Sequence, residues 1–392
     1  AASGGMWLTG WPDGAPRPGG AGALVAAERW AAAFRDLAAR LGRPVEVDAA
    51  VALFGRAALA GYGRRGRTSA GGRCRLLPAA DGWVAVHLAR PEDEEAVPAV
   101  VGGDETAPPW DALARFAAAT PAEEVAARAQ LLGVPAAALG TAPARPLPPV
   151  GVPPGRPPPA RPPIVVDLSA MWAGPLCAHL LGRAGARVVK VESRHRPDGA
   201  RAGDPAFFGW LHAGHEQVTL DLRTQGGRDD LRRLLDGADV VLESSRPRAL
   251  RQLGIDAGEV VAGTGCTWVS ITGHGREGPA GDLVAFGDDA AVAGGLVAAD
   301  EGGGPVFCAD AVADPLTGLL AAAAAATAVL DGGARLLDVA MRDVAAAAAG
   351  EDVGGDDAEV VATAAGRWAV RVAGEAHEVR PPRPPRPPRP PS

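Results

Sequence analysis

The sequence predicts an α/β protein in which a parallel β-sheet is joined to a smaller α+β module. From residue 164 onward, short apolar runs alternate with helix-like segments, and this alternation is typical of right-handed βαβ units that build a parallel sheet. Just before that region, residues 146–163 read PLPPVGVPPGRPPPARPP. So much proline excludes regular hydrogen-bonded structure, and we expect a polyproline-type linker that separates the sheet from residues 1–145.

Residues 1–145 mix helix and strand signals. The segment 24–42, LVAAERWAAAFRDLAARLG, has an apolar face at helical spacing and ends in a glycine, so we expect a helix there. The segment 73–89, RCRLLPAADGWVAVHLA, predicts two strands joined by an Asp-Gly turn. Residues 121–140 predict a second amphipathic helix followed by a short apolar stretch.

After the linker, the apolar pattern changes to that of buried strands. The first is IVVDLS, 164–169, and a helix follows from Gly174. Parallel sheets bind ligands at the carboxyl ends of their strands, so we expect residues 169–175, 192–201 and 243–247 to line one crevice. The first turn lacks the glycine-rich dinucleotide fingerprint, which argues against an ordinary NAD-dependent enzyme. The other expected elements are strands at 186–192, 237–245 and 266–273 and a helix at 226–237.

Composition narrows the class of protein. The chain has 392 residues, enough for two domains, and its formal net charge of -7 argues against a general nucleic-acid binder. No basic segment followed by an apolar one opens the sequence, and the alanine-rich run 319–330 is too short to span a membrane. These features predict a soluble cytoplasmic protein. Four scattered cysteines lack metal-ligand spacing, so we expect no metal and four free buried thiols, Cys74, Cys177, Cys266 and Cys308.

The sequence ends in RPPRPPRPPRPPS, a low-complexity segment for which we expect an exposed, basic polyproline conformation. It is either an SH3-type ligand or a solvated tail without a partner. The expected division of the chain is a small module at 1–145, the linker at 146–163, an α/β catalytic domain at 164–350, a short β-containing segment at 351–379 and the tail at 380–392.

Two aspartates stand just ahead of an alanine-rich run in residues 307–330, FCADAVADPLTGLLAAAAAATAVL. Alanine and leucine favour a helix, and Pro315 fits the first helical position because its missing N–H costs nothing there. This places Asp314 at the N-cap, where unpaired backbone N–H groups and the helix dipole hold a carboxylate ionised and oriented. On these residues alone, Asp314 is either an ordinary cap or a nucleophile.

Residues 164–345 resemble the class III CoA-transferases, a family that includes formyl-CoA transferase, carnitine-CoA transferase and 2-methylacyl-CoA racemase. The resemblance rests on motifs in family order, among them VVDLSAMWAGPL, ARVVKVES, TLDLRT, VSITGHGREGP and VADPLTGL. It implies a Rossmann-like α/β domain that binds coenzyme A, and an interlocked homodimer. Residues 66–93 and 128–140 are similar to the family's small-domain and C-terminal modules. Here they precede the CoA-binding unit, either as a permuted arrangement or as a partial tandem.

The resemblance also implies a mechanism. In transferases of this family, an aspartate in a Gly/Ala-Asp-x-x-x-Gly setting attacks the acyl-CoA thioester, and ADPLTG, 313–318, matches that setting. Asp314 would then be the nucleophile of a covalent reaction that passes through an anhydride and an aspartyl-CoA thioester. The substrates would be an acyl-CoA and a small carboxylic acid, with no nucleic-acid or membrane partner. Asp310 remains a second candidate, because spacing alone does not separate the two aspartates.

The same resemblance implies where coenzyme A would bind. The first loop of the α/β domain would lie near the pantetheine and diphosphate, TLDLRT would contact the adenine nucleotide, and arginines after the second strand would bind the diphosphate. Ser244, Ser245 and Arg246 stand where the family often has an Asn-aromatic pair, so adenine stacking loses its usual residue there. Each position has an alternative interpretation as a packing residue or a solvated charge. The implied contacts are Ala170, Met171, Trp172, Ala173, Arg194, Arg201, Leu220, Arg223, Ser244 and Ser245, with Arg196 as a further candidate.

Two other functions compete with CoA transfer. The racemase branch uses a histidine in a GHD-type motif, but the corresponding stretch here is FGDDAAVAGG, 286–295, with Asp288 where the histidine would stand. α-Proton chemistry on an acyl-CoA would need Asp314 together with Asp288 or His274. The third candidate is a coenzyme A-binding protein without activity, whose proline-rich tail recruits partners.

Overall fold

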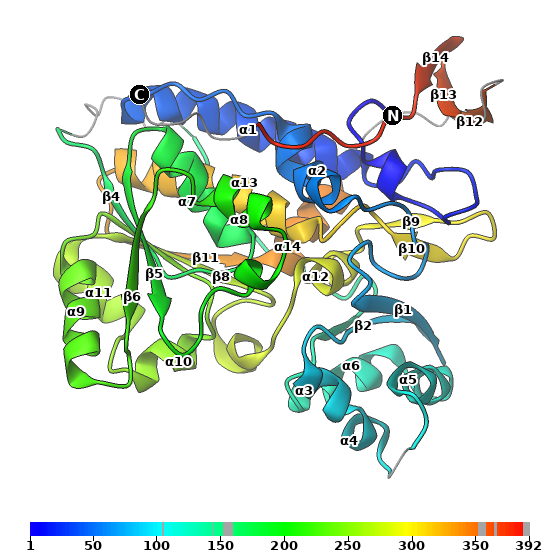
Figure 1. Cartoon of the computed structure of the whole chain (residues 1–392), viewed down its shortest axis with the longest axis horizontal. Coiled ribbons are helices and arrows are strands. Elements are labelled where there is room, and N and C mark those ends of the chain that lie inside the picture. The colour runs from blue at the N-terminus through cyan, green and yellow to red at the C-terminus, as the bar shows by residue number, and fades with distance from the viewer. Residues whose placement is uncertain (104–105, 144, 152–159, 352–357, 364–366, 387–392) are drawn as a thin grey trace.

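The structure is a computed structural model that describes residues 1–103, 106–143, 145–151, 160–351, 358–363 and 367–386. Within these residues, the central feature is a six-stranded parallel sheet with the order β11-β8-β7-β4-β5-β6 (Figure 1). Numbered along the chain from β4, this is the 3-2-1-4-5-6 order of a doubly wound Rossmann-type sheet. The α/β class predicted from the sequence is confirmed. The strands are β4 (Ile164–Asp167), β5 (Arg187–Ser193), β6 (Glu216–Leu220), β7 (Val240–Glu243), β8 (Thr267–Thr272) and β11 (Arg335–Ala340).

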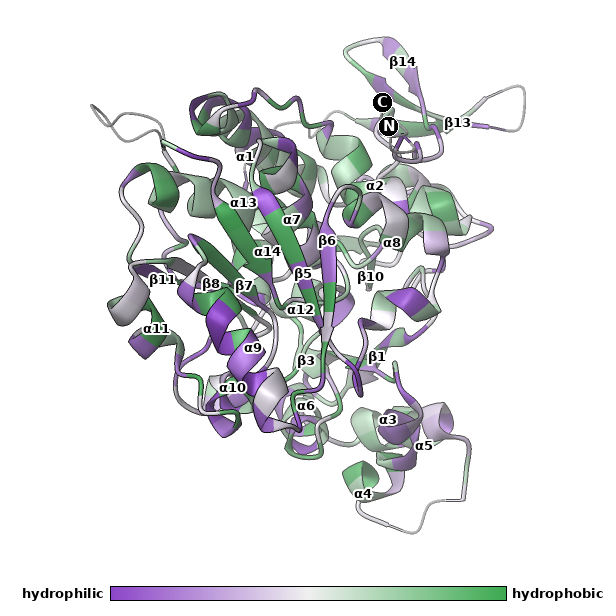
Figure 2. Ribbon diagram, turned by 60° about the vertical axis from the view of Figure 1, so that its left-hand side comes forward, coloured by the Kyte–Doolittle hydropathy of each residue, from purple (hydrophilic) through white to green (hydrophobic). Residues whose placement is uncertain are grey.

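Successive residues on the sheet's strands are buried on opposite faces. Val165 and Val240 pack with helices α1, α7, α13 and α14, whereas Val166 and Val241 pack with α9, α10 and α11. Burial on both faces explains why inner strands such as β4 and β7 are apolar runs in the sequence. Figure 2 shows β7 and β8 in green and the surface helix α9 largely in purple. These helices are α1 (Ala21–Leu41), α7 (Ala173–Arg183), α9 (Gln225–Asp236), α10 (Pro247–Gln252), α11 (Ala257–Thr264), α13 (Ala313–Leu330) and α14 (Met341–Ala349).

Helix α13 is buried along almost its whole length. It packs against α7 and α1, and its small side chains allow these helices to approach closely. A Cβ added at Gly318 would lie 2.7 Å from the carbonyl oxygen of Ala173. With 18 residues, α13 is longer than the run 319–330 considered in the sequence and could cross a membrane by length and hydropathy, but 83% of it is buried inside the protein. It is therefore a core helix of this fold.

The segment 1–145 divides between two hydrophobic cores. Helix α2 (Ala49–Ala60) joins α1 in the core that contains α13. A second core lies under a three-stranded antiparallel sheet, β1-β2-β3. The small module thus comprises the later part of the segment. Its elements are β1 (Cys74–Ala79), β2 (Gly82–His87), α3 (Pro91–Glu95), α4 (Val97–Val101), α5 (Pro109–Ala118), α6 (Ala122–Leu131) and β3 (Ala136–Ala138).

Helix α12 (Gly287–Ala293) connects the small module to the large core. It contacts β2 and β3 on one side and α13 and α14 on the other, and the backbone N–H of Gly140 donates to the carbonyl of Val292. The remaining elements of the large unit are α8 (Pro205–Leu211), the antiparallel pair β9 (Val297–Ala299) and β10 (Pro305–Phe307), and the 3-10 turns η1 (Met6–Leu8), η2 (Gly199–Ala202) and η3 (Gly278–Asp282).

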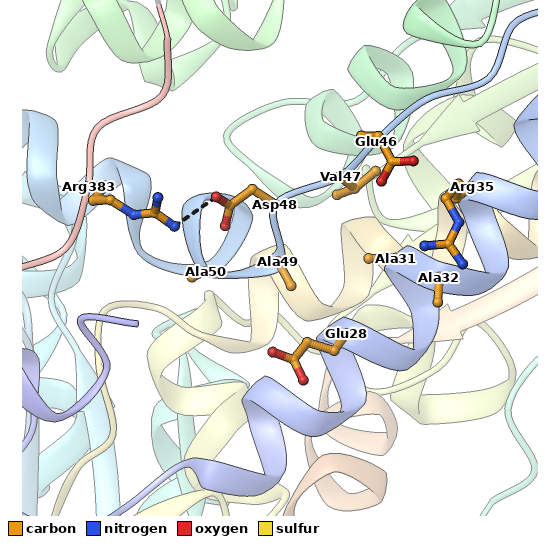
Figure 3. Close-up of a pocket in the computed structure, with 10 residues that line it drawn as sticks. All are labelled: Glu28, Ala31, Ala32, Arg35, Glu46, Val47, Asp48, Ala49, Ala50 and Arg383. Atoms are coloured by element: carbon orange, nitrogen blue, oxygen red, sulfur yellow. Dashed lines mark hydrogen bonds and ion pairs between the residues drawn. The ribbon is translucent and has the colours of Figure 1, made fainter. Parts of the chain in front are cut away.

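The C-terminal part of the chain forms a further three-stranded antiparallel sheet and then runs along α2 (Figure 1). The sheet consists of β12 (Glu359–Ala362), β13 (Trp368–Val372) and β14 (Glu375–Glu378). Beyond it, Arg383 Nη2 lies 2.8 Å from Asp48 Oδ2, beside a cavity of about 310 Å³ (Figure 3). Pro385 is buried while Arg383 and Arg386 are exposed. The expected exposure of the tail therefore holds for these arginines but not for the proline, and residues 387–392 lie outside the described residues.

Each strand and helix expected from the sequence is present. The expected helix at 24–42 is α1, which ends at Gly42, and the expected hairpin at 73–89 is β1-β2. The four cysteines are free and buried, as expected. Of the predicted linker, residues 152–159 lie outside the described residues.

We expect Gly318→Ala to destabilise the protein, because the new methyl group would lie 2.7 Å from the carbonyl oxygen of Ala173 and 2.9 Å from Leu176 Cβ. Overpacking of this kind costs about 1–3 kcal/mol. Gly209→Ala is the matched control, since that helical glycine has no atom within 4 Å of an added Cβ. Urea unfolding should show Gly209→Ala unchanged or slightly more stable, and equal stability of both variants would contradict the close packing of α13 on α7.

Candidate active site

Asp314 is the second residue of α13 and does not cap the helix. The helix begins at Ala313, and the N-cap residue Val312 has a helical backbone and makes no side-chain hydrogen bond to the helix. The prediction of an N-cap aspartate is therefore wrong. The reason lies in the preceding turn, where Ala309 (φ 57°) and Ala311 (φ 43°) adopt the left-handed conformation and turn the chain before the helix starts. The Asp314 side chain is left free to face α12.

Four aspartates gather where α12 and α13 begin. Asp288 is buried and accepts a hydrogen bond of 2.9 Å from the backbone N–H of Ala311. Asp314 is partly exposed, and its Oδ2 lies so close to Gly287 that an added Cβ there would come within 2.4 Å of it. Both members of the predicted pair, Asp310 and Asp314, thus lie in one acidic cluster with two residues of α12. We call Asp288, Asp289, Asp310 and Asp314 the acidic cluster.

The surroundings of the acidic cluster raise the pKa of two of its carboxyl groups. Burial raises the pKa of Asp314 to about 7; the charge of Arg56 opposes this rise, and Asp288 and Asp289 add to it. Burial also raises the pKa of Asp288, and the charge of His87 opposes that rise. A carboxyl group that titrates near neutrality can act both as a base and as a nucleophile, and such shifts concentrate at functional sites.

Two side chains from the first 145 residues, an arginine and a histidine, contact the acidic cluster. The guanidinium of Arg56 donates to both oxygens of Asp310, with Nε–Oδ2 at 2.9 Å and Nη2–Oδ1 at 2.7 Å. His87 Nδ1 lies 3.2 Å from Asp289 Oδ1, and the imidazole packs 4.7 Å from the ring of Phe286. The sequence analysis did not find either residue. One feature of the sequence could have indicated Arg56. It is a single charged residue in the apolar helix AAVALFGRAALA, and such a residue requires a buried partner.

His274, the histidine that the sequence offered for proton chemistry, lies elsewhere. Its Nε2 is 3.5 Å from Gln130 Nε2 of the small module, and burial lowers its pKa. The histidine that is hydrogen-bonded to the acidic cluster is His87. Among the described residues, no group of three or more His, Cys, Asp or Glu side chains is placed to hold a metal ion.

The first loop of the α/β domain lies at the point where the strand order reverses, between β4 and β7. The backbone N–H of Ala170 donates to Ser244 Oγ at 3.0 Å, across this switch point. Met171 has a φ of 71°, and its N–H donates to Asp198 Oδ1 at 2.9 Å. Trp172 is buried, and the Arg56 guanidinium lies 5.2 Å from its ring centre. The loop that was expected to face coenzyme A therefore also contacts the residue that binds Asp310.

The cations expected after β5 differ in their freedom to bind a ligand. The Arg201 guanidinium donates to Glu192 at 3.0 Å, and it lies 4.1 Å from the ring centre of Phe208. The hydrogen bonds from Arg201 lower the pKa of Glu192 to about 2, so this pair is ionised at neutral pH. Arg201 is thus neutralised within the protein. Arg194 is exposed, and only its backbone is held, by a hydrogen bond to Leu220.

The other implied contacts are spread along the same edge of the sheet. Leu220 is buried at the end of β6, so its side chain belongs to the core. Arg223 is exposed, with its backbone N–H bound to Asp221. Ser245 Oγ donates to Glu243 at 3.0 Å. The structure therefore brings Ala170, Met171 and Ser244 together at the switch point, while Leu220 and Arg223 lie at the outer strand.

A cluster of arginines lies beyond the ends of β5 and β7. Burial lowers the pKa of Arg246, and the positive charges of Arg248, Arg196 and Arg90 lower it further. Arg90 comes from the small module, where it pairs with Asp93. Arg248 also has an acidic neighbour, since its Nε lies 3.4 Å from Asp282 Oδ1. An anion bound beside these arginines would relieve their mutual repulsion. We call Arg90, Arg196, Arg246 and Arg248 the arginine cluster.

A buried ion network supports the first loop from below. Lys190 is fully buried, with its Nζ 3.0 Å from Asp198 Oδ2 and 3.7 Å from Asp167 Oδ2. Lys190 also donates to the carbonyl of Ser169. Burial and the Lys190 charge lower the pKa of the neighbouring His212 to about 4, so that imidazole is neutral at neutral pH. Since Asp198 also binds Met171, the network fixes the backbone of the loop.

Lys190→Met should destabilise the protein strongly, because it leaves two buried carboxylates without their cation. Breaking a buried ion pair on one side costs about 3–5 kcal/mol. Arg187→Met, on the same strand, is the matched control, since its ion pair with Glu216 is exposed on both sides and such pairs contribute less than about 1 kcal/mol. Urea unfolding of both variants measures the difference, and similar losses would contradict the network.

Asp314→Asn should change the pH dependence of stability. The folded-state pKa of Asp314, about 7, lies above its ordinary value of 3.8, so the folded protein loses stability as pH rises between these values. At about 1.4 kcal/mol per pKa unit, the ionised carboxylate costs at most about 4 kcal/mol. The asparagine variant should therefore gain stability relative to the parent between pH 5 and pH 8, measured by thermal unfolding. A constant difference across that range would contradict the raised pKa.

Comparison with known proteins places this site in a family. The sequence pattern of CoA-transferase family III matches residues 163–379, more than half of the chain. The chain therefore belongs to CoA-transferase family III, and the resemblance seen in its motifs is confirmed.

Its similarity to individual proteins is partial. The chain is 31% identical over 205 residues to succinate–glutarate CoA-transferase of Agrobacterium fabrum. The aligned residues cover 47% of this chain and 51% of that protein. It is 34% identical over 140 residues to succinyl-CoA–D-citramalate CoA-transferase of Chloroflexus aurantiacus, covering 34% of this chain and 35% of that protein. The crystal structure of Rv3272 from Mycobacterium tuberculosis is 27% identical, covers 57% of this chain and 65% of that chain, and has a TM-score of 0.49. The matches thus span about a third to a half of the two curated relatives.

Proposed function

We propose that this protein transfers coenzyme A from an acyl-CoA to a carboxylic acid, with Asp314 as the nucleophile. The observation that carries the proposal is the position of Asp314, a half-buried residue of the acidic cluster, at the start of α13 within the family match. Asp310 is the weaker candidate, because it is fully buried and both its oxygens are bound by Arg56. The names of the relatives, which pair succinyl-CoA with glutarate or citramalate, support the same reaction type.

The reaction proceeds by covalent exchange at the Asp314 carboxyl. A carboxylate oxygen of Asp314 attacks the thioester carbon, and the C–S bond breaks to give a mixed anhydride and the CoA thiolate. The thiolate then attacks the aspartyl carbonyl, which releases the donor carboxylate and leaves an aspartyl-CoA thioester. The acceptor carboxylate repeats these steps in reverse and leaves as the new acyl-CoA. Covalent catalysis of this kind divides one difficult exchange into easier steps, and water must be excluded while the anhydride exists.

We propose that coenzyme A lies along the carboxyl edge of the sheet. The arginine cluster suits its phosphates, because guanidinium groups bind phosphate oxygens in pairs. The loop at Ala170 and Met171 would run beside the pantetheine, between these arginines and Asp314. Arg201 has a lesser part than its sequence position suggests, since Glu192 neutralises it. The homodimer implied by the family and a cytoplasmic location belong to the same proposal, which size-exclusion chromatography and cell fractionation would test.

Proton exchange at the acyl α-carbon is the second candidate function. Two observations favour it: the pKa of Asp314 lies near neutrality, and a histidine, His87, contacts the acidic cluster through Asp289. A group that titrates near the working pH is an efficient general base or acid. Solvent deuterium would then enter the α-carbon of a bound acyl-CoA, whereas CoA transfer leaves that carbon unchanged.

Intact-mass analysis should detect the covalent intermediate. Purified protein is mixed with a panel of acyl-CoAs that includes succinyl-CoA, with and without hydroxylamine. We expect a CoA-sized, hydroxylamine-labile adduct on the parent chain and none on Asp314→Ala, with turnover reduced roughly 10⁴-fold or more. Asp331→Ala is the matched control. Asp331 directly follows the C-terminal end of the same helix, and its side chain pairs with Arg335.

The same samples in deuterated water separate the alternatives. Absence of the adduct together with deuterium at the α-carbon would replace the transferase by the proton-exchange enzyme. Binding of acyl-CoA without adduct or exchange would identify a coenzyme A-binding protein without activity.

A further inference from the structure

Arg56 is brought to the acidic cluster by the N-terminal helix α2, although α2 lies outside the family match at 163–379. It is the only charged residue in that helix, and its side chain is 23% exposed. A guanidinium this far from water requires partners, since an unpaired buried charge is costly. Its partners show what it does.

The guanidinium is fixed on two sides. Its Nε and Nη2 donate to the two oxygens of Asp310, which is the paired geometry that fixes a carboxylate most firmly. On the other side, the guanidinium carbon lies 5.2 Å from the ring centre of Trp172 and 6.0 Å from that of Phe207. Arg56 thus spans the distance between the loop after β4 and the turn before α13.

That turn is strained, and it depends on its bonds. Ala309 and Ala311, on either side of Asp310, have φ values of 57° and 43°, a conformation that costs a non-glycine residue about 1 kcal/mol or more. Three contacts hold the turn: Ala309 N–H donates to Thr9 Oγ1, Ala311 N–H donates to Asp288 Oδ1, and Arg56 binds Asp310. The turn ends at the residue before α13, so it determines where the helix begins and where its second residue, Asp314, lies.

We propose that Arg56 is a positioning residue of the reaction: through Asp310 it holds the turn that presents Asp314, and its positive charge favours the ionised form of that carboxyl. This inference rests on the proposed function, in which Asp314 is the nucleophile. It gives the N-terminal segment, which precedes the family match, a defined part in the reaction.

The charges around Asp314 explain why this cation matters. Asp288 and Asp289 face it from α12, Asp310 lies one turn before it, and His87 reaches the cluster from β2. Arg56 is the one residue named here whose positive charge lowers the pKa of Asp314; the surrounding carboxylates and burial raise it. Loss of Arg56 would leave Asp314 protonated over more of the neutral range, and a protonated carboxyl is a poor nucleophile.

Two variants that should shift the ionisation midpoint of Asp314 in opposite directions test the proposal. Arg56→Gln removes the cation, so the pH at which Asp314 is half ionised should rise by about one unit, the size of shift that one close charge produces. Asp310→Asn removes a negative charge and leaves the Arg56 charge unbalanced, so that midpoint should fall. The titration is followed by NMR of ¹³C-carboxyl-labelled aspartate, with the Asp314 signal assigned by its absence in Asp314→Asn. Arg233→Gln, at the exposed ion pair with Asp230 on α9, is the control and should leave the midpoint unchanged.

Arg56→Lys separates charge from positioning. It should restore the midpoint to within a few tenths of a pH unit of the parent, but adduct formation from acyl-CoA should stay at least about tenfold slower, because an ammonium cannot hold Asp310 by two parallel bonds. The pH dependence of adduct formation should follow the NMR midpoint in each variant. If Arg56→Gln does not fold, which circular dichroism would show, Asp310→Asn decides: a lowered midpoint supports the proposal, and an unchanged one overturns it.

The outcomes distinguish this inference from the proposed function. Midpoints that do not differ between Arg56→Gln and Arg233→Gln overturn the role of Arg56 even if the parent forms the adduct. If the midpoints of the variants shift but the parent forms no adduct, the result would support the electrostatic role of Arg56 and contradict Asp314 as the nucleophile.

Discussion

Burial of helix α13 on every side is the constraint on which the rest of the structure depends. Its alanines allow α7 and α1 to pack closely against it, and α7 in turn fixes the loop that precedes it at the end of β4. Because α13 is buried, it cannot tilt or slide without disturbing both neighbours. The first turn of α13 is therefore held firmly, and Asp314 is part of that turn. A reactive carboxyl on a rigid element can be aligned more precisely than one on a flexible loop.

The N-terminal segment completes this arrangement, although it stands before the α/β domain in the sequence. Helix α1 covers α13, α2 brings Arg56 to the acidic cluster, and β2 brings His87. The arginine cluster also receives a member, Arg90, from the small module. The acidic cluster and the arginine cluster thus both bring together residues from before and after the proline-rich linker.

The sequence predicted the regular elements well because their signals are local. Buried strands such as β4 and β8 are short apolar runs, and α1 and α9 have apolar residues at helical spacing. β6 and β11 were not predicted, since EQVTL and RLLDVA carry polar or charged residues on partly exposed outer strands. The site was harder to predict, because its contacts join residues that are far apart in the sequence. Arg56 and Asp310 are 254 positions apart, and His87 and Asp289 are 202 apart. The N-cap prediction failed because alanine rarely adopts the left-handed conformation, so nothing local indicated it for Ala309 and Ala311.

The four carboxyl groups of the acidic cluster differ in how they are bonded. Asp310 is bound by Arg56, Asp289 by His87 and the N–H of Phe286, and Asp288 by the N–H of Ala311. These bonds engage both oxygens of Asp310 but only one oxygen each of Asp288 and Asp289, whose Oδ2 has no hydrogen-bond partner among the described residues. Asp314 has the N–H of Gly287 as its close backbone partner, keeps some exposure, and carries the energetic cost of the surrounding negative charge. Poor solvation and repulsion by neighbouring charges both make a carboxylate more willing to give up its charge, and this is the physical basis of the proposal that Asp314 is the nucleophile.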